Sequence, residues 1–274
     1  MISKQKINTL LPKILIGSII VVAAIAIFEM AMHSEGTGVN IKHPDRLLVV
    51  DHQELYPSKI IERKGFTVSY NEQLKIPNWV SWKLTANMAK GELPRSNNFA
   101  PDPDVPSSAL PQDYKHSGYD RGHMAPAGDM KWSEKAMTQC FYMTNIAPQK
   151  QVLNSGPWNK LEERCRTWAN KYGEVYIICG PVLTDRPTEF IGASKVAVPK
   201  RFFKVIFAPN TPNGPMGIGF IMNNGKNDGG MQQTALSINE VEAITGYNFF
   251  ASLPDSIEKQ VESQNNLLLW DAKK

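Results

Sequence analysis

The chain has 274 residues, 42% of them hydrophobic and 20% charged, and its formal net charge is +4. This length allows one sizeable domain with short additions, and the apolar content is ordinary for a globular protein. The modest charge argues against a protein that coats a duplex electrostatically, but it allows an enzyme with a local basic groove. The three cysteines cannot all be paired, and Cys140, Cys165 and Cys179 lack the spacing of a zinc site.

The N-terminal segment contains an uninterrupted apolar run at 14–28, preceded by lysines and ended by Glu29. As a helix the run would be about 22 Å long, shorter than the ~30 Å hydrocarbon core of a membrane. It is either a secretory signal peptide or an uncleaved anchor, and we favour the anchor because the cleavage-like Ala24–Ala26 lies inside the run. We therefore expect a bacterial cell-envelope protein with its main domain outside the cytoplasm, or a secreted one if the segment is cleaved.

The domain organisation follows from composition. We assign 1–33 to the signal peptide or anchor, 34–56 to a tether with glycines and mixed charges, and 57–274 to one compact domain. Alternating apolar residues predict strands at 66–70 and 79–84, joined by a hairpin.

Further along the chain, a proline-rich loop is followed by mixed helices and strands. The expected elements are a loop at 91–111, a short helix turning into a strand at 140–143, a helix from Gly156 to Gly173, strands at 174–179, 202–207 and 217–222, and helices opening at Ser237 and at 255–265. Because strands and helices do not alternate regularly, we predict an α+β fold, with a mixed, largely antiparallel sheet and flanking helices.

The run Asp120-Arg121-Gly122-His123 is the first candidate for chemistry. On an extended backbone, Arg121 and His123 point to the same face. A neutral imidazole can take a proton from water, and a guanidinium can hold the charge that develops on a phosphate. Gly122 between them would let a backbone or phosphate approach closely. Taken alone, the four residues favour a histidine with a purely structural role, because a histidine near an arginine is more often a hydrogen-bonded structural residue.

Two residues downstream supply oxygen ligands, namely Asn154 and Glu162. An amide and a carboxylate are few protein ligands for a metal ion. Mg²⁺ can bind to so few because it keeps several of its water ligands. On one continuous helix the two residues would be separated by about 12 Å of rise. We therefore expect Glu162 to reach the metal through water.

The chain resembles the family of DNA/RNA non-specific endonucleases. The family motif is found at Tyr119–Ala127, with the downstream matches Asn145–Gln149, Asn154 and Glu162, and the similarity extends over about residues 57–262. The resemblance implies a ββα-metal core that holds one Mg²⁺, for which Mn²⁺ substitutes. It also implies hydrolysis of DNA and RNA without sequence preference, products with 5′-phosphates, and allows a homodimer.

The resemblance also implies roles for individual residues. His123 is the general base, and Arg121 and Arg95 bind the phosphate. Asn154 is the direct protein ligand of the metal, and Glu162 binds a metal-bound water and helps to orient the site.

Two further residues are expected to support the site without reacting. Asp120 should point away from Arg121 and His123, because neighbours on an extended strand face opposite sides. Asn145 is either a site residue or a structural amide that holds the loop, and we favour the structural or supporting role.

Three other functions fit parts of the pattern. A nucleic-acid-binding homologue at the membrane could have the same fold without catalysis. A phosphodiesterase for small nucleotides or lipids would share the chemistry, and a structural envelope protein would need only the N-terminal segment. The active nuclease is favoured because every chemical position is filled.

Overall fold

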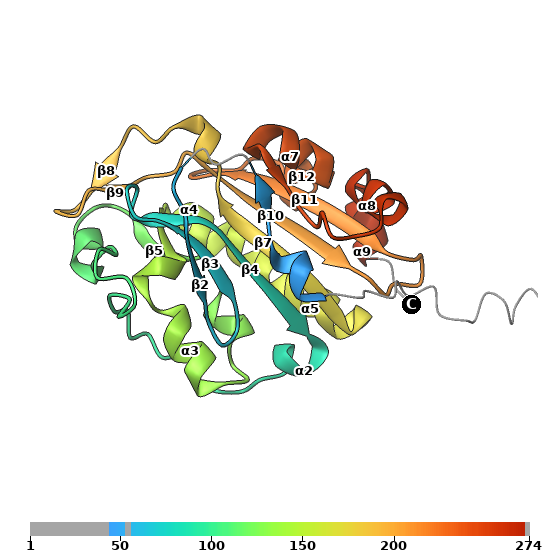
Figure 1. Ribbon diagram of the computed structural model, residues 1–274, viewed down its shortest axis with the longest axis horizontal. Coiled ribbons are helices and arrows are strands. Elements are labelled where there is room, and N and C mark those ends of the chain that lie inside the picture. Colours follow the sequence, from blue (N-terminus) through green and yellow to red (C-terminus); the bar gives the residue numbers. More distant parts are fainter. Residues whose placement is uncertain (1–43, 53–55, 272–274) are drawn as a thin grey trace, which may run out of the picture. The chain divides into compact units, whose positions relative to one another are not determined.

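The computed structural model describes residues 44–52 and 56–271. Its centre is a seven-stranded sheet in the order β12-β11-β10-β7-β4-β3-β2, in which every neighbouring pair is antiparallel (Figure 1). Its strands are β2 (Lys59–Glu62), β3 (Thr67–Asn71), β4 (Ile76–Thr85), β7 (Glu174–Pro181), β10 (Arg201–Ala208), β11 (Met216–Asn223) and β12 (Ala235–Leu236). The predicted α+β class and largely antiparallel sheet are confirmed.

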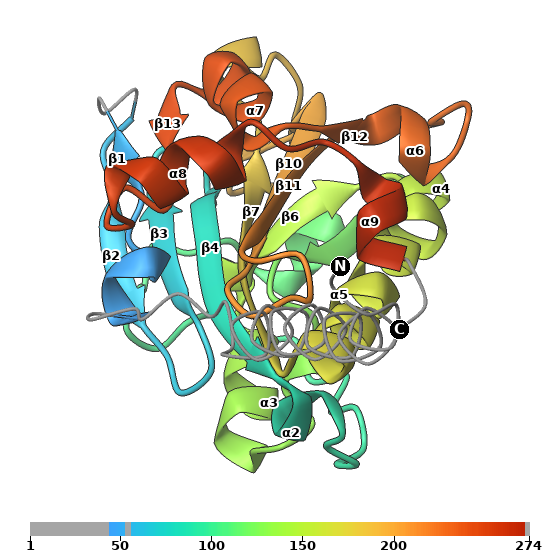
Figure 2. The same ribbon diagram turned by 90° about the vertical axis from the view of Figure 1, so that its right-hand side faces the viewer.

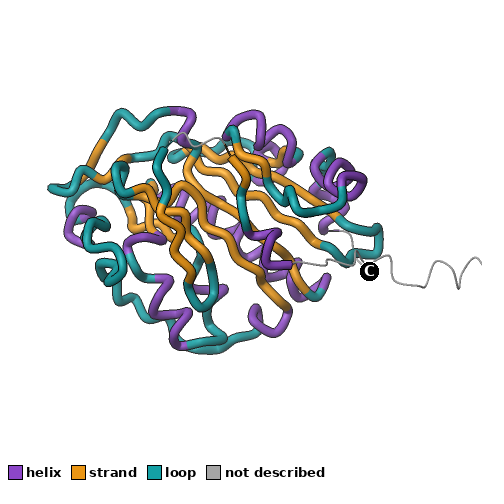
Figure 3. Tube along the Cα trace, viewed as in Figure 1, coloured by secondary structure: helices purple, strands orange, loops and turns teal. Residues whose placement is uncertain are grey.

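Smaller elements surround this sheet. Short strand pairs are β1 (Asp51–His52) with β13 (Tyr247–Asn248), β5 (Asp120–His123) with β6 (Ile146–Gln149), and β8 (Phe190–Ile191) with β9 (Val196–Ala197). The α-helices are α2 (Ala86–Ala89), α3 (Glu134–Cys140), α4 (Gln151–Leu153), α5 (Asn159–Tyr172), α6 (Met231–Thr234), α7 (Ile238–Thr245), α8 (Asp255–Glu262) and α9 (Leu267–Asp271). Between α2 and β5 the chain is mostly irregular, as the proline-rich sequence predicts (Figure 3).

The sheet separates two hydrophobic cores, because successive residues of a strand face opposite sides. On β4, for example, Trp82 belongs to the core beneath α5, whereas Trp79 belongs to the core beneath α7 and α8 (Figure 2). Leu161 and Cys165 lie on the buried stripe of α5, and Gly173 ends that helix with a φ of 89°. The β5–β6 pair packs on the α5 side, so one face of the sheet supports the candidate site.

Three details differ from the sequence predictions. The strand expected at 140–143 is wrong: α3 occupies Glu134–Cys140, and the strand is β6 at Ile146–Gln149. The sequence analysis missed β6 because Pro148 argues against a central strand. A proline is tolerated here because β6 belongs to a two-stranded pair. The helix expected from Gly156 begins at Asn159, after a kink in which Gly156 has φ −106° and ψ −118°. The helix expected at 255–265 ends earlier, as α8, and α9 is a further helix that the sequence analysis did not predict.

Part of the expected tether belongs to the compact fold. The 3₁₀ turn Pro44–Leu48 and strand β1 pack on the sheet, with Leu47 and Val50 buried. Strand β1 pairs with β13, and the Ser81 hydroxyl donates a hydrogen bond to the Leu48 carbonyl. The apolar run at 14–28 lies outside the described residues. Within the described ranges, no helix is both long and apolar enough to cross a bilayer.

Candidate active site

The candidate site is built by β5, β6 and the kinked turn that leads into α5. These three elements form a ββα unit beside the large sheet (Figure 1). A cavity of about 530 Å³ opens here, and it is lined by the five side chains that the sequence analysis selected for chemistry: Arg95, Arg121, His123, Asn154 and Glu162. Residues more than 60 positions apart in the chain thus face one solvent-filled space.

His123 is set into the wall of this cavity. It is only 6% exposed, and its ring packs against Phe141 at 4.8 Å and Phe99 at 5.2 Å between centroids. Burial lowers the pKa of His123 to about 3, and the positive charges of Arg95 and Arg121 act in the same direction. Its Nε2 has no hydrogen-bond partner among the described residues. The lowered pKa favours the neutral imidazole, which is the form that can accept a proton.

Two arginines border the cavity on aromatic supports. The guanidinium of Arg121 lies 4.2 Å from the ring centroid of Phe99, and that of Arg95 lies 5.0 Å from the ring of Phe141. Arg95 also donates from Nε to the Asn97 side-chain oxygen at 2.7 Å. Neither arginine forms an ion pair with a carboxylate in the described part of the chain. Their charges are therefore available to an anion such as phosphate.

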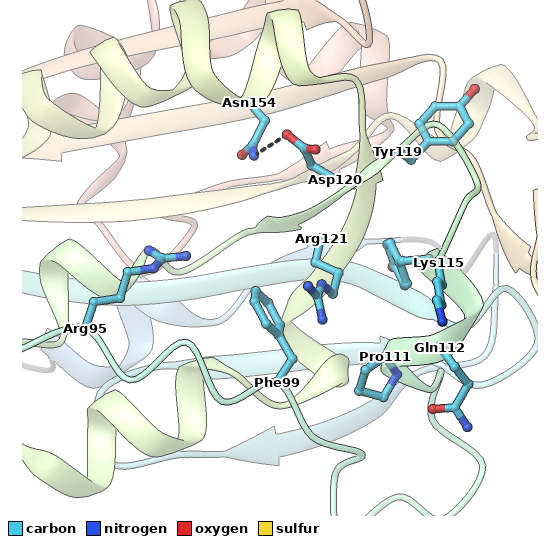
Figure 4. A pocket seen from close by; sticks show the side chains of 10 residues that line it. Arg95, Phe99, Pro111, Gln112, Lys115, Tyr119, Asp120, Arg121 and Asn154 are labelled. Atoms are coloured by element: carbon cyan, nitrogen blue, oxygen red, sulfur yellow. Dashed lines mark hydrogen bonds between the residues drawn. The ribbon is translucent and has the colours of Figure 1, made fainter.

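Asn154 is held by Asp120. Its Nδ2 donates a hydrogen bond of 2.9 Å to Oδ2 of Asp120 (Figure 4). This bond uses the amide nitrogen and does not engage the amide oxygen of Asn154. Asp120 lies at the start of β5, directly before Arg121. The supporting role that the sequence analysis expected for Asp120 stays a prediction, and this hydrogen bond is the contact through which it would act.

Glu162 lies half-buried on α5, in the wall of the same cavity. Burial raises the pKa of Glu162 to about 7, although the ammonium of Lys204 acts in the opposite direction. Because the chain kinks at Gly156, Asn154 and Glu162 do not lie along one straight helix. Both line the same cavity, despite the eight positions between them in sequence.

The donor set fits a magnesium ion. In residues 44–52 and 56–271 there is no group of three or more His, Cys, Asp or Glu side chains that could enclose a metal. A protein cage for zinc or calcium is therefore not formed by these side chains. One oriented amide oxygen on Asn154, with Glu162 across the cavity, suits an ion that keeps most of its waters.

Asn145 and Gly122 organise the backbone around the site. Asn145 is fully buried and bonds only to main-chain groups: its oxygen accepts from Ala125 N, and its nitrogen donates to the carbonyls of Ala125 and Cys140. A Cβ on Gly122 would lie 2.2 Å from Oε1 of Gln149. The prediction that Gly122 admits a backbone or phosphate is therefore wrong, because the Gln149 side chain fills that space.

Arg166 is a cavity residue that the sequence analysis missed. It lies one helical turn after Glu162 on α5, lines the cavity and forms an ion pair of 2.9 Å with Asp129. Asp129 in turn accepts a hydrogen bond of 3.0 Å from the indole of Trp82. The spacing of four positions from Glu162 was a usable signal, because residues i and i+4 share one face of a helix.

A second cavity, of about 580 Å³, adjoins the first. It shares Arg95, Arg121 and Asn154 with the first cavity (Figure 4). Its remaining lining combines aromatic, amide and cationic side chains: Phe99, Tyr114, Tyr119, Gln112 and Lys115, with Pro111 and Asp120. The two arginines and Asn154 therefore lie at the junction of two hollows rather than at the end of one.

The sequence was compared with known protein families. The model of the DNA/RNA non-specific endonuclease family matches residues 52–256. The chain belongs to this family.

Individual members of the family are similar over most of the chain. The mouse (Mus musculus) protein "Nuclease EXOG, mitochondrial" is 36% identical over 221 residues, which are 73% of this chain and 60% of the relative. Nuclease C1 of Cunninghamella echinulata is 36% identical over 70% of this chain and 83% of its own length. The solved structure of a complex of EndoG with EndoGI matches with a TM-score of 0.69 and 31% identity, covering 76% of this chain and 91% of that chain.

The chain covers only part of the length of some relatives. The chain spans about 60% of the length of the mouse EXOG nuclease and less of its human counterpart, at 55%. The family match from residue 52 also includes β1, in the segment that the sequence analysis assigned to a tether. The predicted domain limits, 57–274, stay a prediction.

The predicted location in a bacterial cell envelope is contradicted by the names of the relatives. The mouse and human members of the family matched here are named mitochondrial nucleases, not envelope proteins.

Proposed function

We propose that the protein is a metal-dependent endonuclease that hydrolyses DNA and RNA without sequence preference and leaves 5′-phosphate ends. One observation carries the proposal. A single cavity gathers a neutral buried imidazole, two guanidinium groups without carboxylate partners, and an oriented amide oxygen. This combination suits the attack of water on a phosphodiester.

In this proposal His123 is the general base. Its imidazole takes a proton from the attacking water, for which the neutral form of the ring is required. The packing of the ring against Phe99 and Phe141 limits its rotation, so the ring is held in place before substrate arrives. Arg121 and Arg95 hold the phosphate and offset the charge that develops on its oxygens during attack.

Asn154 and Glu162 would hold the metal ion, Asn154 through its amide oxygen and Glu162 through a water molecule. When bound, Mg²⁺ supplies positive charge for the pentacovalent phosphate and the leaving 3′ oxygen. Asp120 keeps the Asn154 amide turned so that its oxygen remains available. Mn²⁺ has similar ligand preferences and should substitute.

The two adjoining cavities support a polymeric substrate. A phosphodiester held by Arg95 and Arg121 at their junction would have a cavity on each side for a flanking nucleotide. A small nucleotide or a lipid headgroup would need only one of them. Phosphate contacts position a nucleic acid without reading its sequence, which agrees with non-specific cleavage. A homodimer stays a prediction.

The decisive experiment incubates the purified protein with supercoiled plasmid, single-stranded DNA and RNA, with and without Mg²⁺. We expect nicked and then linear plasmid, degradation of both single-stranded substrates, loss of activity in chelator, and recovery with Mg²⁺ or Mn²⁺. Plasmid has no ends, so its cleavage separates endonuclease from exonuclease action. Binding of the plasmid without cleavage would instead support the nucleic-acid-binding homologue that lacks catalysis.

His123→Ala tests the assignment of the base. Loss of general-base catalysis should lower the cleavage rate per folded molecule by roughly 10²- to 10⁴-fold, with the folded fraction taken from urea unfolding. His116→Asn is the matched control: His116 is exposed and has a φ of 59°, which asparagine tolerates. Full activity in His123→Ala would refute the mechanism.

A further inference from the structure

Lys204 is a buried cation directly behind the candidate site. It lies on β10, where it pairs with Cys179 of β7 and Phe220 of β11. Its side chain is 0% exposed, and its ammonium has no hydrogen-bond acceptor among the described residues. Burying an ammonium is costly unless other groups compensate. A methionine could fill a similar volume without that cost, so packing alone does not account for a lysine here.

Two indole rings lie beside the ammonium. Trp158 is bonded to the cavity residue His123, and Trp82 is bonded to Asp129, the ion-pair partner of the cavity residue Arg166. Nζ lies 4.3 Å from the ring centroid of Trp158 and 5.5 Å from that of Trp82. The Trp158 indole donates a hydrogen bond of 3.4 Å to the backbone carbonyl of His123. Trp158 also immediately precedes α5, four positions after Asn154 and four before Glu162. A shift of this indole would therefore affect several groups of the site together.

Carboxylates lie near Lys204. Burial lowers the pKa of Lys204, but nearby negative charges, among them those of Glu162 and Asp129, act in the opposite direction and the pKa is raised. Glu162 lines the cavity, and Asp129 pairs with the cavity residue Arg166, so the charge of Lys204 is coupled to the wall of the site.

We propose that Lys204 is a positioning residue for the hydrolytic reaction: its buried ammonium holds the Trp158 indole in place and, through that indole, the backbone of His123. The proposal rests on the proposed nuclease function. Lys204 does not line either cavity, so it acts without touching substrate.

The test compares Lys204→Met with the parent in the plasmid assay and in steady-state cleavage of a labelled oligonucleotide with Mg²⁺. Urea unfolding gives the folded fraction, and rates are expressed per folded molecule. We expect kcat to fall by roughly 10- to 100-fold, as for other residues that orient a site, with KM changed less than about twofold. The Trp158 indole N–H resonance should also move in a ¹H–¹⁵N spectrum.

Lys83→Met is the matched control. Lys83 also lies over an aromatic ring, 5.4 Å from the centroid of Tyr176, and lines neither cavity. This variant should keep the parental kcat. A Lys204→Met protein with parental kcat per folded molecule would overturn the proposal. A parent that does not cut would overturn the proposed function and the positioning role with it.

Trp158→Phe decides the question if Lys204→Met does not fold. It keeps a ring for the ammonium but removes the N–H that bonds to His123. We expect kcat to fall about fivefold, the usual effect of one hydrogen bond. Where both variants fold, the double variant should lose less than the product of the single losses. A fully active Trp158→Phe, or independent effects in the double variant, would overturn the proposed pathway.

Discussion

Replacement of Asp120 by alanine tests whether the amide of Asn154 must be held to bind the metal. In the structure, the carboxylate of Asp120 accepts a hydrogen bond of 2.9 Å from the side-chain amide of Asn154. Without it the amide can rotate and present nitrogen instead of oxygen to the ion. A nitrogen with two hydrogens cannot bind a cation, so metal affinity should fall.

The size of the effect follows from this hydrogen bond. A bond to a charged acceptor contributes about 1.5–3 kcal/mol, and the lower end applies because solvent reaches both half-buried side chains. A loss of about 1.4 kcal/mol corresponds to a tenfold change in a dissociation constant. We therefore expect Asp120→Ala to bind Mg²⁺ roughly tenfold more weakly.

The assay is calorimetric titration with Mg²⁺, together with the Mg²⁺ concentration that gives half the maximal cleavage rate. Asp120→Asn should give a smaller change, because its side-chain oxygen can still accept the bond. Asp185→Ala is the control: Asp185 is a half-buried carboxylate paired with Arg201 that lines neither cavity. An unchanged Mg²⁺ affinity in Asp120→Ala would show that Asp120 does not orient the ligand.

Three further substitutions test separate features of the fold. Gly122→Ala should lower the free energy of unfolding by about 1–3 kcal/mol in urea, because its Cβ would overlap Gln149; an unchanged midpoint would contradict the close packing. Ser237→Ala removes an N-cap bond to the backbone of α7 and should cost about 1 kcal/mol, measured in the same way. Burial raises the pKa of Glu262 to about 8, above its unfolded value, so the folded state binds the proton more tightly and stability falls as pH rises from about 4.5 to 8. Glu262→Gln should reduce the difference between urea midpoints at pH 5 and pH 8.5, and an unchanged difference would rule out this carboxyl as a source.

Local patterns predicted much of the framework. Apolar alternation located β3, β4, β10 and β11, and the three- and four-residue spacing of Leu161, Cys165 and Trp168 located α5. The serine and glutamate of the α7 capping box make both predicted hydrogen bonds. Such signals are readable because they depend on neighbours within a few residues. Strand β6 escaped prediction because its identity depends on pairing with β5, about 26 positions earlier in the chain.

The sequence by itself determined the chemical groups of the site. The types, order and spacing of Arg121, His123, Asn154 and Glu162, together with the family resemblance that they carry, predicted phosphodiester chemistry with a magnesium-type ligand set. Family membership agrees with that prediction.

Only the tertiary structure decided how these groups are supported. The bond from Asn154 to Asp120, the space beside Gly122 that Gln149 fills, and the burial of Lys204 behind Trp158 all join segments that are 27 or more positions apart. A one-dimensional pattern specifies which face of a strand or helix a side chain occupies. It does not specify which distant side chain meets that face, because such contacts depend on how the sheet and α5 pack together.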